Sequence, residues 1–239
     1  MTETALPQPE TTPGTGALTR AAISAALDPA GWRLLMGSVV TSVPVASLAE
    51  AAQVAARIAA AAEGADQRRL RIDLRPDRVI VAVGSALATR VRAAEVELAL
   101  RITHALAADG ITTDPDAGRR TAQVLELAID ALDPAAIRPF WVAVLGYGDE
   151  PRNPGSDKPI MDPYEQGPTI WFQVMDAPRP QRNRIHFDLA VSPDQARPRI
   201  DAAVAAGGRV VSDAAAPAFW VLADPEGNEV CVCTWEGRD

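Results

Sequence analysis

The sequence predicts a mixed α+β protein of two domains, and three observations support this fold class. Helical periodicity and strand-like alternation both occur in each half of the chain. Residues 111–121 are polar and rich in turn-forming residues, which indicates a linker between a domain over residues 17–110 and a second over residues 122–239. The chain of 239 residues is long enough for two domains of ordinary size.

Composition and charge narrow the class of protein. Hydrophobic residues make up 48% of the chain and charged residues 23%, which is typical of a globular protein. The net charge of −8 argues against nucleic-acid and anionic-membrane partners, because both require a basic surface. No apolar run approaches the length needed to span a bilayer. Residues 1–16 are rich in Thr, Pro, Gly and Glu and lack the features of a secretory signal, so we expect a disordered tail.

The two cysteines, Cys231 and Cys233, are separated by one residue and share a face of the last predicted strand. So close a pair does not make a structural disulfide. This cysteine usage fits a reducing compartment, and we expect a cytoplasmic protein.

The N-terminal domain is predicted to run helix, two strands, helix, two strands, helix. Ser47, followed by Glu50 three residues later, predicts a capping box at the start of the second helix. The predicted helices cover residues 18–27, 45–63 and 86–109, and the predicted strands lie within residues 32–43, 68–74 and 79–83.

The hairpin over residues 68–83 carries a cluster of arginines on its outer face. Guanidinium groups could bind an anionic ligand. The alternative is a charged face that simply meets water, because charge runs are usually solvated. Five residues form this cluster: Arg68, Arg69, Arg71, Arg75 and Arg78.

The second domain shows one pattern twice: strand, helix, then further strands. Asp133 followed by Pro134 predicts the start of its first helix. Such an internal duplication predicts two units side by side, which would curl into a half-open barrel with a cleft between their inner faces. The predicted strands are 124–130, a short one within 158–164, 169–174, 184–191, 209–212, 219–223 and 229–234, and the predicted helices are 133–145 and 192–206.

One strand of the second unit stands out because it holds His186, one of only two histidines in the chain. Strand alternation places His186, Asp188 and Ala190 on one face. A histidine and a carboxylate on the same face offer a ligand or general-base position. The alternative is a half-buried strand whose polar face meets water. The other histidine, His104, is predicted on a helix surface or at an interface.

Four stretches of the second half carry a resemblance to the vicinal-oxygen-chelate superfamily, in its glyoxalase-like or bleomycin-resistance-like branch. They are 124–134, 140–147, 183–189 and 224–232, in the order that the superfamily shows. The resemblance covers residues 121–235. It implies paired β-α-β-β-β modules, a small organic molecule as ligand, and a homodimer.

The resemblance also implies site residues. The superfamily's metal-ligand positions fall on Glu126, on His186 and on either Cys231 or Glu229, with His186 as the main base or ligand and Glu126 as its catalytic partner. Carboxylates with a histidine suit Zn, Fe or Mn, and a thiolate favours Zn. Cys231 departs from the superfamily's usual pattern, so a metal-free cleft is the alternative. The cleft would be lined by Gln173, Trp171, Phe219 and Trp220.

The activity implied by this resemblance is that of a lyase, an isomerase or a dioxygenase of unknown substrate. The alternative is a metal-free binding or sequestering protein of the drug-resistance type. A small-molecule ligand is common to both.

The first half is similar to pterin carbinolamine dehydratases at residues 31–34, 47–63 and 78–83. The family's His-His-Pro position reads Arg68-Arg69-Leu70 here, and its Thr-His position reads Ser85-Ala86. Dehydration needs a group that exchanges a proton near neutral pH, and arginine cannot do so. The sequence therefore argues against 4a-hydroxytetrahydrobiopterin dehydratase activity and predicts an inactive domain that serves dimerisation or ligand binding.

Overall fold

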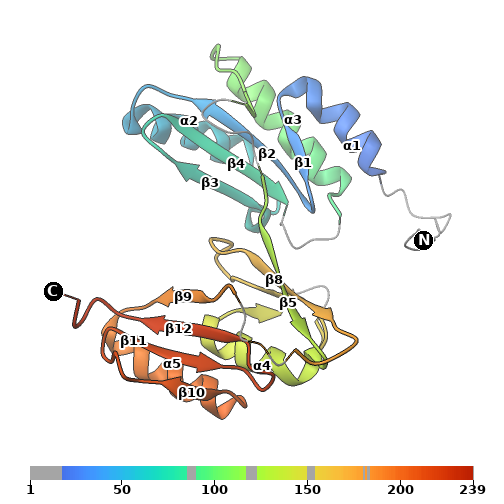
Figure 1. Cartoon of the computed structure of the whole chain (residues 1–239). Coiled ribbons are helices and arrows are strands. Elements are labelled where there is room, and N and C mark those ends of the chain that lie inside the picture. The colour runs from blue at the N-terminus through green and yellow to red at the C-terminus, as the bar shows by residue number, and fades with distance from the viewer. Residues whose placement is uncertain are drawn as a thin grey trace. The chain divides into compact units, whose positions relative to one another are not determined.

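The computed structural model describes residues 18–84, 90–116, 123–149, 154–179, 181 and 184–238. These residues fall into two compact units, one within residues 18–116 and one within residues 123–238 (Figure 1). The predicted tail over residues 1–16 and the dipeptide Ser85-Ala86 lie outside the described residues. No helix in the described part of the chain is long and apolar enough to cross a membrane.

The first unit has the predicted order of elements. A four-stranded antiparallel sheet, in the order β1-β2-β4-β3, packs against helices. The elements are α1 (Arg20–Leu27), β1 (Arg33–Leu35), β2 (Ser38–Pro44), α2 (Leu48–Ala61), β3 (Leu70–Leu74), β4 (Arg78–Gly84) and α3 (Ala93–Ala107), with short 3-10 turns at Asp28–Ala30 and Gln67–Arg69.

One hydrophobic core fills the space between this sheet and its helices. Helix α2 buries Ala51, Val54 and Ile58, whose spacing forms a single apolar stripe. Trp32 is fully buried, and its indole Nε1 donates to Thr103 Oγ1 on α3 at 2.9 Å. The mixed α+β class is therefore confirmed for this unit.

The start of helix α3 differs from the prediction. The helix begins at Ala93 and not at residue 86, and its N-cap is Arg92. The Glu95 carboxylate accepts the backbone N–H of Arg92 at 2.7 Å, which fixes the first turn at this point. Arginine is not a preferred N-cap residue, so the sequence carried little signal for this boundary.

The second unit contains the predicted duplication. Each module begins with a strand that pairs in parallel with the last strand of the same module, giving sheet orders β5-β8-β7-β6 and β9-β12-β11-β10. The first module comprises β5 (Glu126–Ala131), α4 (Pro134–Leu145), β6 (Gly148–Asp149), β7 (Ile160–Met161) and β8 (Thr169–Val174). The second comprises β9 (Phe187–Ala190), α5 (Pro193–Ala205), β10 (Arg209–Ser212), β11 (Phe219–Ala223) and β12 (Glu229–Cys233).

The two modules also share the register of their parallel ladders. Ala128 on β5 pairs with Trp171 on β8. Sixty positions further along both strands, Asp188 on β9 pairs with Cys231 on β12. The described strands of the second unit form two four-stranded sheets, one from each module.

Both modules contribute to one core. Helices α4 and α5 pack against each other, and in Figure 1 they lie on one side of the β9–β12 sheet. Trp141 of α4 meets Phe187 of β9 edge to face, with ring centroids 5.7 Å apart. Because residues next to one another in a strand point to opposite faces, Phe187 and Leu189 face this core while His186, Asp188 and Ala190 face away from it.

Candidate functional site

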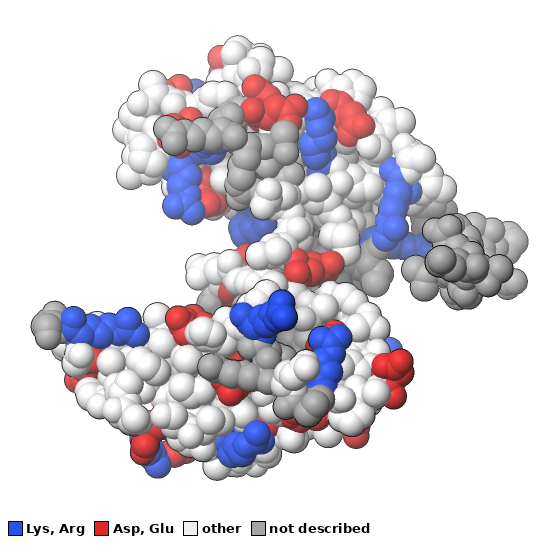
Figure 2. All heavy atoms as spheres, viewed as in Figure 1, with Lys and Arg blue, Asp and Glu red and all other residues white. Residues whose placement is uncertain are grey.

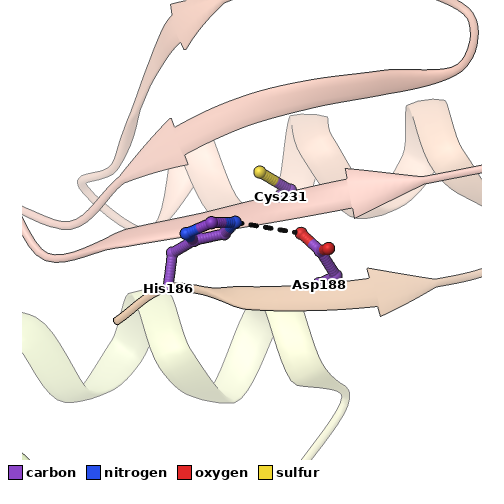
Figure 3. A group of neighbouring side chains, drawn as sticks. All are labelled: His186, Asp188 and Cys231. Carbon is purple, nitrogen blue, oxygen red and sulfur yellow. Dashed lines mark ion pairs between the residues drawn. The ribbon is translucent and has the colours of Figure 1, made fainter. Parts of the chain in front are cut away.

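Three potential metal-ligand side chains meet on the helix-free face of the second module. His186 directly precedes β9, Asp188 lies on β9, and Cys231 lies opposite on β12 (Figure 3). The His186 Nε2 and the Asp188 Oδ1 are 3.5 Å apart. One ligand atom from each of the three residues lies within 4.8 Å of the other two.

The parallel ladder explains this convergence. Cys231 pairs in register with Asp188, so both side chains leave the sheet at the same level and on the same face. His186 stands two residues before Asp188 and therefore points the same way. The sequence segments involved lie more than forty residues apart, and the β9–β12 pairing joins them.

Cys231 is buried, whereas His186 and Asp188 are exposed. Burial, together with the hydrogen bond and the negative charge of Asp188, raises the pKa of the Cys231 thiol to about 11. The thiol is therefore protonated at neutral pH in the metal-free protein. A metal ion that binds here must displace this proton.

The site opens into a groove. One hollow of about 330 Å³ is lined by His186, Asp188, Phe219 and Cys231, among others. A neighbouring hollow of about 520 Å³ extends toward Trp235. Both hollows are lined by Asp188, Cys233 and Arg238, so they form two parts of one groove, called the β9–β12 groove below.

The predicted site residues are distributed over both modules. His186 and Cys231 come together, and Phe219 lines the same hollow. Glu229 lies on β12 two residues before Cys231, and Glu126 begins β5 in the first module; neither belongs to the group of three.

The remaining predicted cleft residues do not line the β9–β12 groove. Trp171 and Gln173 lie on β8 in the first module. Trp220 packs against the hydrophobic core, because it follows Phe219 directly in β11 and points to the opposite face. Of the four residues, Phe219 alone lines a hollow beside His186.

Two features of the site were not in the predicted ligand set. Asp188 could have been included from its position two residues after His186 on the same strand face. Arg238 follows the last strand, and no periodicity or motif in the sequence marks it as a groove residue.

The donor set fits a zinc ion. A histidine nitrogen, a carboxylate oxygen and a thiolate sulfur bind zinc at about 2.0–2.3 Å, so tetrahedral ligands stand about 3.3–3.8 Å from one another. The donor atoms here lie within 4.8 Å of one another, and two exposed side chains can close the difference by rotation. Three protein ligands would leave a fourth position open for a ligand atom.

On one face of the molecule, the surface charge does not gather into a single patch. On the face shown in Figure 2, basic and acidic residues are interspersed and separated by uncharged ones. This pattern fits recognition of a small molecule within a groove better than binding of a polyanion across a surface.

Two modules of β-α-β-β-β topology with a shared core define the class of this unit. Residues 126–233 match the family model described as "Glyoxalase-like domain". The second half of the chain thus carries a glyoxalase-like domain of the vicinal-oxygen-chelate superfamily.

Several solved structures also match slightly less than half of the chain. A glyoxalase-related enzyme from Fulvimarina pelagi is 20% identical, with 47% of this chain and 87% of that chain covered and a TM-score of 0.37. A glyoxalase/bleomycin resistance protein/dioxygenase family enzyme from Burkholderia phytofirmans PsJN is 16% identical, with 46% and 95% covered and a TM-score of 0.38. A glyoxalase/bleomycin resistance protein/dioxygenase from Alicyclobacillus acidocaldarius is 19% identical, with 48% and 93% covered and a TM-score of 0.35. Among curated proteins, none matches.

Proposed function

We propose that the glyoxalase-like domain binds a small organic molecule in the β9–β12 groove, with a zinc ion held by His186, Asp188 and Cys231. The observation that carries this proposal is the convergence of these three side chains at the floor and rim of one hollow. A bound zinc ion would polarise an oxygen atom of the ligand as a Lewis acid.

The protein's own residues have distinct roles in this proposal. The imidazole of His186 is exposed at the rim, where it can bind the metal or exchange a proton with a ligand. Asp188 lies beside both His186 and Cys231. Its carboxylate would compensate part of the positive charge of a zinc ion bound between them. Phe219 offers a flat apolar surface to the ligand in the same hollow.

Metal analysis of protein purified without chelator tests the zinc centre. We expect about one zinc per chain, and at least a tenfold loss of zinc affinity in His186→Ala and Cys231→Ser. The matched controls are His104→Ala, the other histidine, which lies exposed on α3, and Cys233→Ser, the other thiol of β12. Both controls should keep their zinc.

Two results would count against the zinc centre. One is the absence of zinc uptake by the wild type. The other is zinc binding that survives both site substitutions. Either result would leave the metal-free alternative, in which the groove sequesters its ligand without chemical change. Mass spectrometry of recovered ligand separates that alternative from a lyase, isomerase or dioxygenase, because only an enzyme releases an altered molecule.

For the first unit we propose a non-catalytic role in dimerisation, with a pterin-dehydratase-type fold. Three members of the arginine cluster pair with acids of the same unit: Arg68 with Asp66, Arg75 with Asp73, and Arg69 with Glu95. The first two pairs are exposed and the third is largely buried, and all three favour a role within this unit over an anion site. Light scattering should report a homodimer, and a dehydratase assay should show no turnover above background.

A reducing, cytoplasmic location remains part of the proposal. Both cysteines are free thiols, and a zinc centre that contains Cys231 needs that thiol reduced. Oxidation of Cys231 would remove one of the three metal ligands.

A further inference from the structure

Among the described residues that line the β9–β12 groove, one is a permanently charged cation, the guanidinium of Arg238. Arg238 lines both hollows, whereas His186 lies in the first hollow and Trp235 in the second. The guanidinium therefore stands where the two parts of the groove meet.

Backbone carbonyl groups hold this side chain in place. Arg238 Nε donates to the Thr234 carbonyl oxygen at 2.7 Å, and Nη2 donates to the Ala218 carbonyl oxygen at 3.4 Å. These acceptors are neutral, and they fix the plane of the guanidinium. No carboxylate among the described residues lies within ion-pair distance of Arg238.

The other charged group shared by the two hollows is Asp188. Asp188 stands with His186 and Cys231 in the first hollow, so the proposed metal site and the guanidinium of Arg238 share that hollow.

Apolar side chains line both hollows. Phe219 and Ala218 line the first hollow, Ala190 and Val191 line the second, and Trp235 exposes most of its side chain beside it. A ligand that fills the groove therefore meets a flat apolar surface along its body and the guanidinium of Arg238 partway along it.

We propose that Arg238 is the specificity-determining residue of the groove and that the ligand is an aromatic or otherwise flat molecule bearing a carboxylate. This inference rests on the proposed function, because it names the chemical class that the groove accepts. A carboxylate is the acceptor that best matches the planar geometry of a guanidinium group.

Matched probe pairs test this inference. Naphthalene and biphenyl carboxylic acids, each with its own carboxamide, are titrated into the full chain and followed by NMR of the Arg238 Nε–H and the Trp235 indole N–H. We expect each acid to bind at least about tenfold more tightly than its amide, which corresponds to one charge-assisted hydrogen bond. Phosphonates of the same aromatic bodies show whether a tetrahedral anion can replace the carboxylate.

Variants of Arg238 test whether this residue causes the preference for acids over amides. Arg238→Gln should abolish the preference for acids while retaining the weak binding of the amides, and Arg238→Lys should retain part of the preference. Arg197→Gln is the matched control, because Arg197 is an exposed arginine on α5 that pairs with Asp201. It lowers the net charge equally and should leave the preference intact.

The outcomes distinguish this inference from the proposed function. Equal binding of acids and amides, or a preference that survives Arg238→Gln, would overturn the role of Arg238 while leaving the groove as a binding site. Tighter binding of phosphonates than of carboxylates would overturn the carboxylate assignment. If no member of any pair perturbs Trp235 at millimolar concentration, both this inference and the proposed use of the groove are wrong.

Discussion

The indole Nε1 of Trp141 donates a hydrogen bond of 3.0 Å to the carboxylate of Asp224, and both residues are buried. Trp141 lies on α4 in the first module, and Asp224 begins the turn between β11 and β12 in the second. The same carboxylate accepts the backbone N–H groups of Glu226 and Asn228, each at 2.9 Å. One buried side chain therefore shapes the turn before β12 and joins the two modules.

Replacement of Asp224 should destabilise the second unit strongly. Asp224→Ala leaves the Trp141 N–H and two turn N–H groups without their acceptor, and we expect a loss of about 3–5 kcal/mol in the free energy of unfolding. Urea unfolding followed by tryptophan fluorescence measures it. Asp213→Ala, at an exposed loop position, should change stability by less than about 0.5 kcal/mol. A loss below about 1 kcal/mol in Asp224→Ala would contradict this account.

Disruption of the ion pair between Arg69 and Glu95 should destabilise the first unit in a similar way. The two side chains are 12% and 7% exposed, and Arg69 Nε and Nη2 have no hydrogen-bond partner in favourable geometry among the described residues. Glu95→Gln removes the charge that compensates this guanidinium, so we expect a loss of about 3–5 kcal/mol.

A double variant checks the cause of that loss. Arg69→Met together with Glu95→Gln removes both charges and should recover much of the stability lost by Glu95→Gln alone. Glu97→Gln is the control, because Glu97 lies two residues away on the same helix and is exposed. If the double variant is no more stable than the single one, the uncompensated charge is not the cause.

The N-cap of α2 gives a smaller and more local effect. Ser47 Oγ accepts the backbone N–H of Glu50 at 3.2 Å, and Glu50 Oε2 accepts the backbone N–H of Ala46 at 2.7 Å. Ser47→Ala should cost about 1 kcal/mol, and Ser47→Gly only a few tenths. Thermal unfolding of the two variants provides the comparison, and equal losses would argue against the side-chain cap.

The raised pKa of Cys231 predicts slow thiol chemistry in the metal-free protein. With a pKa of about 11, the thiolate is scarce at pH 8, so alkylation by iodoacetamide should be far slower than in the unfolded chain and should accelerate up to about tenfold per pH unit up to pH 10. Asp188→Asn removes the hydrogen-bonding carboxylate and should speed the reaction. Peptide mass spectrometry measures it, with Asp201→Asn as control.

The raised pKa of Cys231 also makes the free energy of unfolding depend on pH. The folded-state pKa lies above the ordinary thiol value of 9.0, so the native state holds this proton more tightly than the unfolded chain does. The resulting stabilisation is complete below pH 9 and is lost as the pH rises toward 11. Cys231→Ala should therefore flatten the dependence of the unfolding free energy on pH between 9 and 11. An unchanged slope would show that other groups control it.

Local patterns predicted most of the fold. Strands β8, β10 and β11 have the predicted bounds, because each is a short run of β-branched or aromatic residues between turn residues. The N-caps Ser47 and Asp133 are confirmed. The start of α3 was missed, and β9 starts at Phe187, three residues later than predicted.

The site was harder to predict than the fold, because it depends on pairing between distant segments. Alternation alone places Asp188 on the face of His186. The register between β9 and β12, which brings Cys231 to the same level, has no local signature in the sequence. The role of Arg238 depends on how the chain turns back after β12, where two carbonyl groups fix the side chain.

The common register of the two modules shows that equivalent positions carry different kinds of side chain. Position by position, Ala128 and Trp171 occupy in the first module the places that Asp188 and Cys231 occupy in the second. A duplicated scaffold needs its reactive groups in only one copy. The equivalent positions of the other copy can then change without loss of those groups. In this protein the first module has an alanine and a tryptophan where the second module has a carboxylate and a thiol.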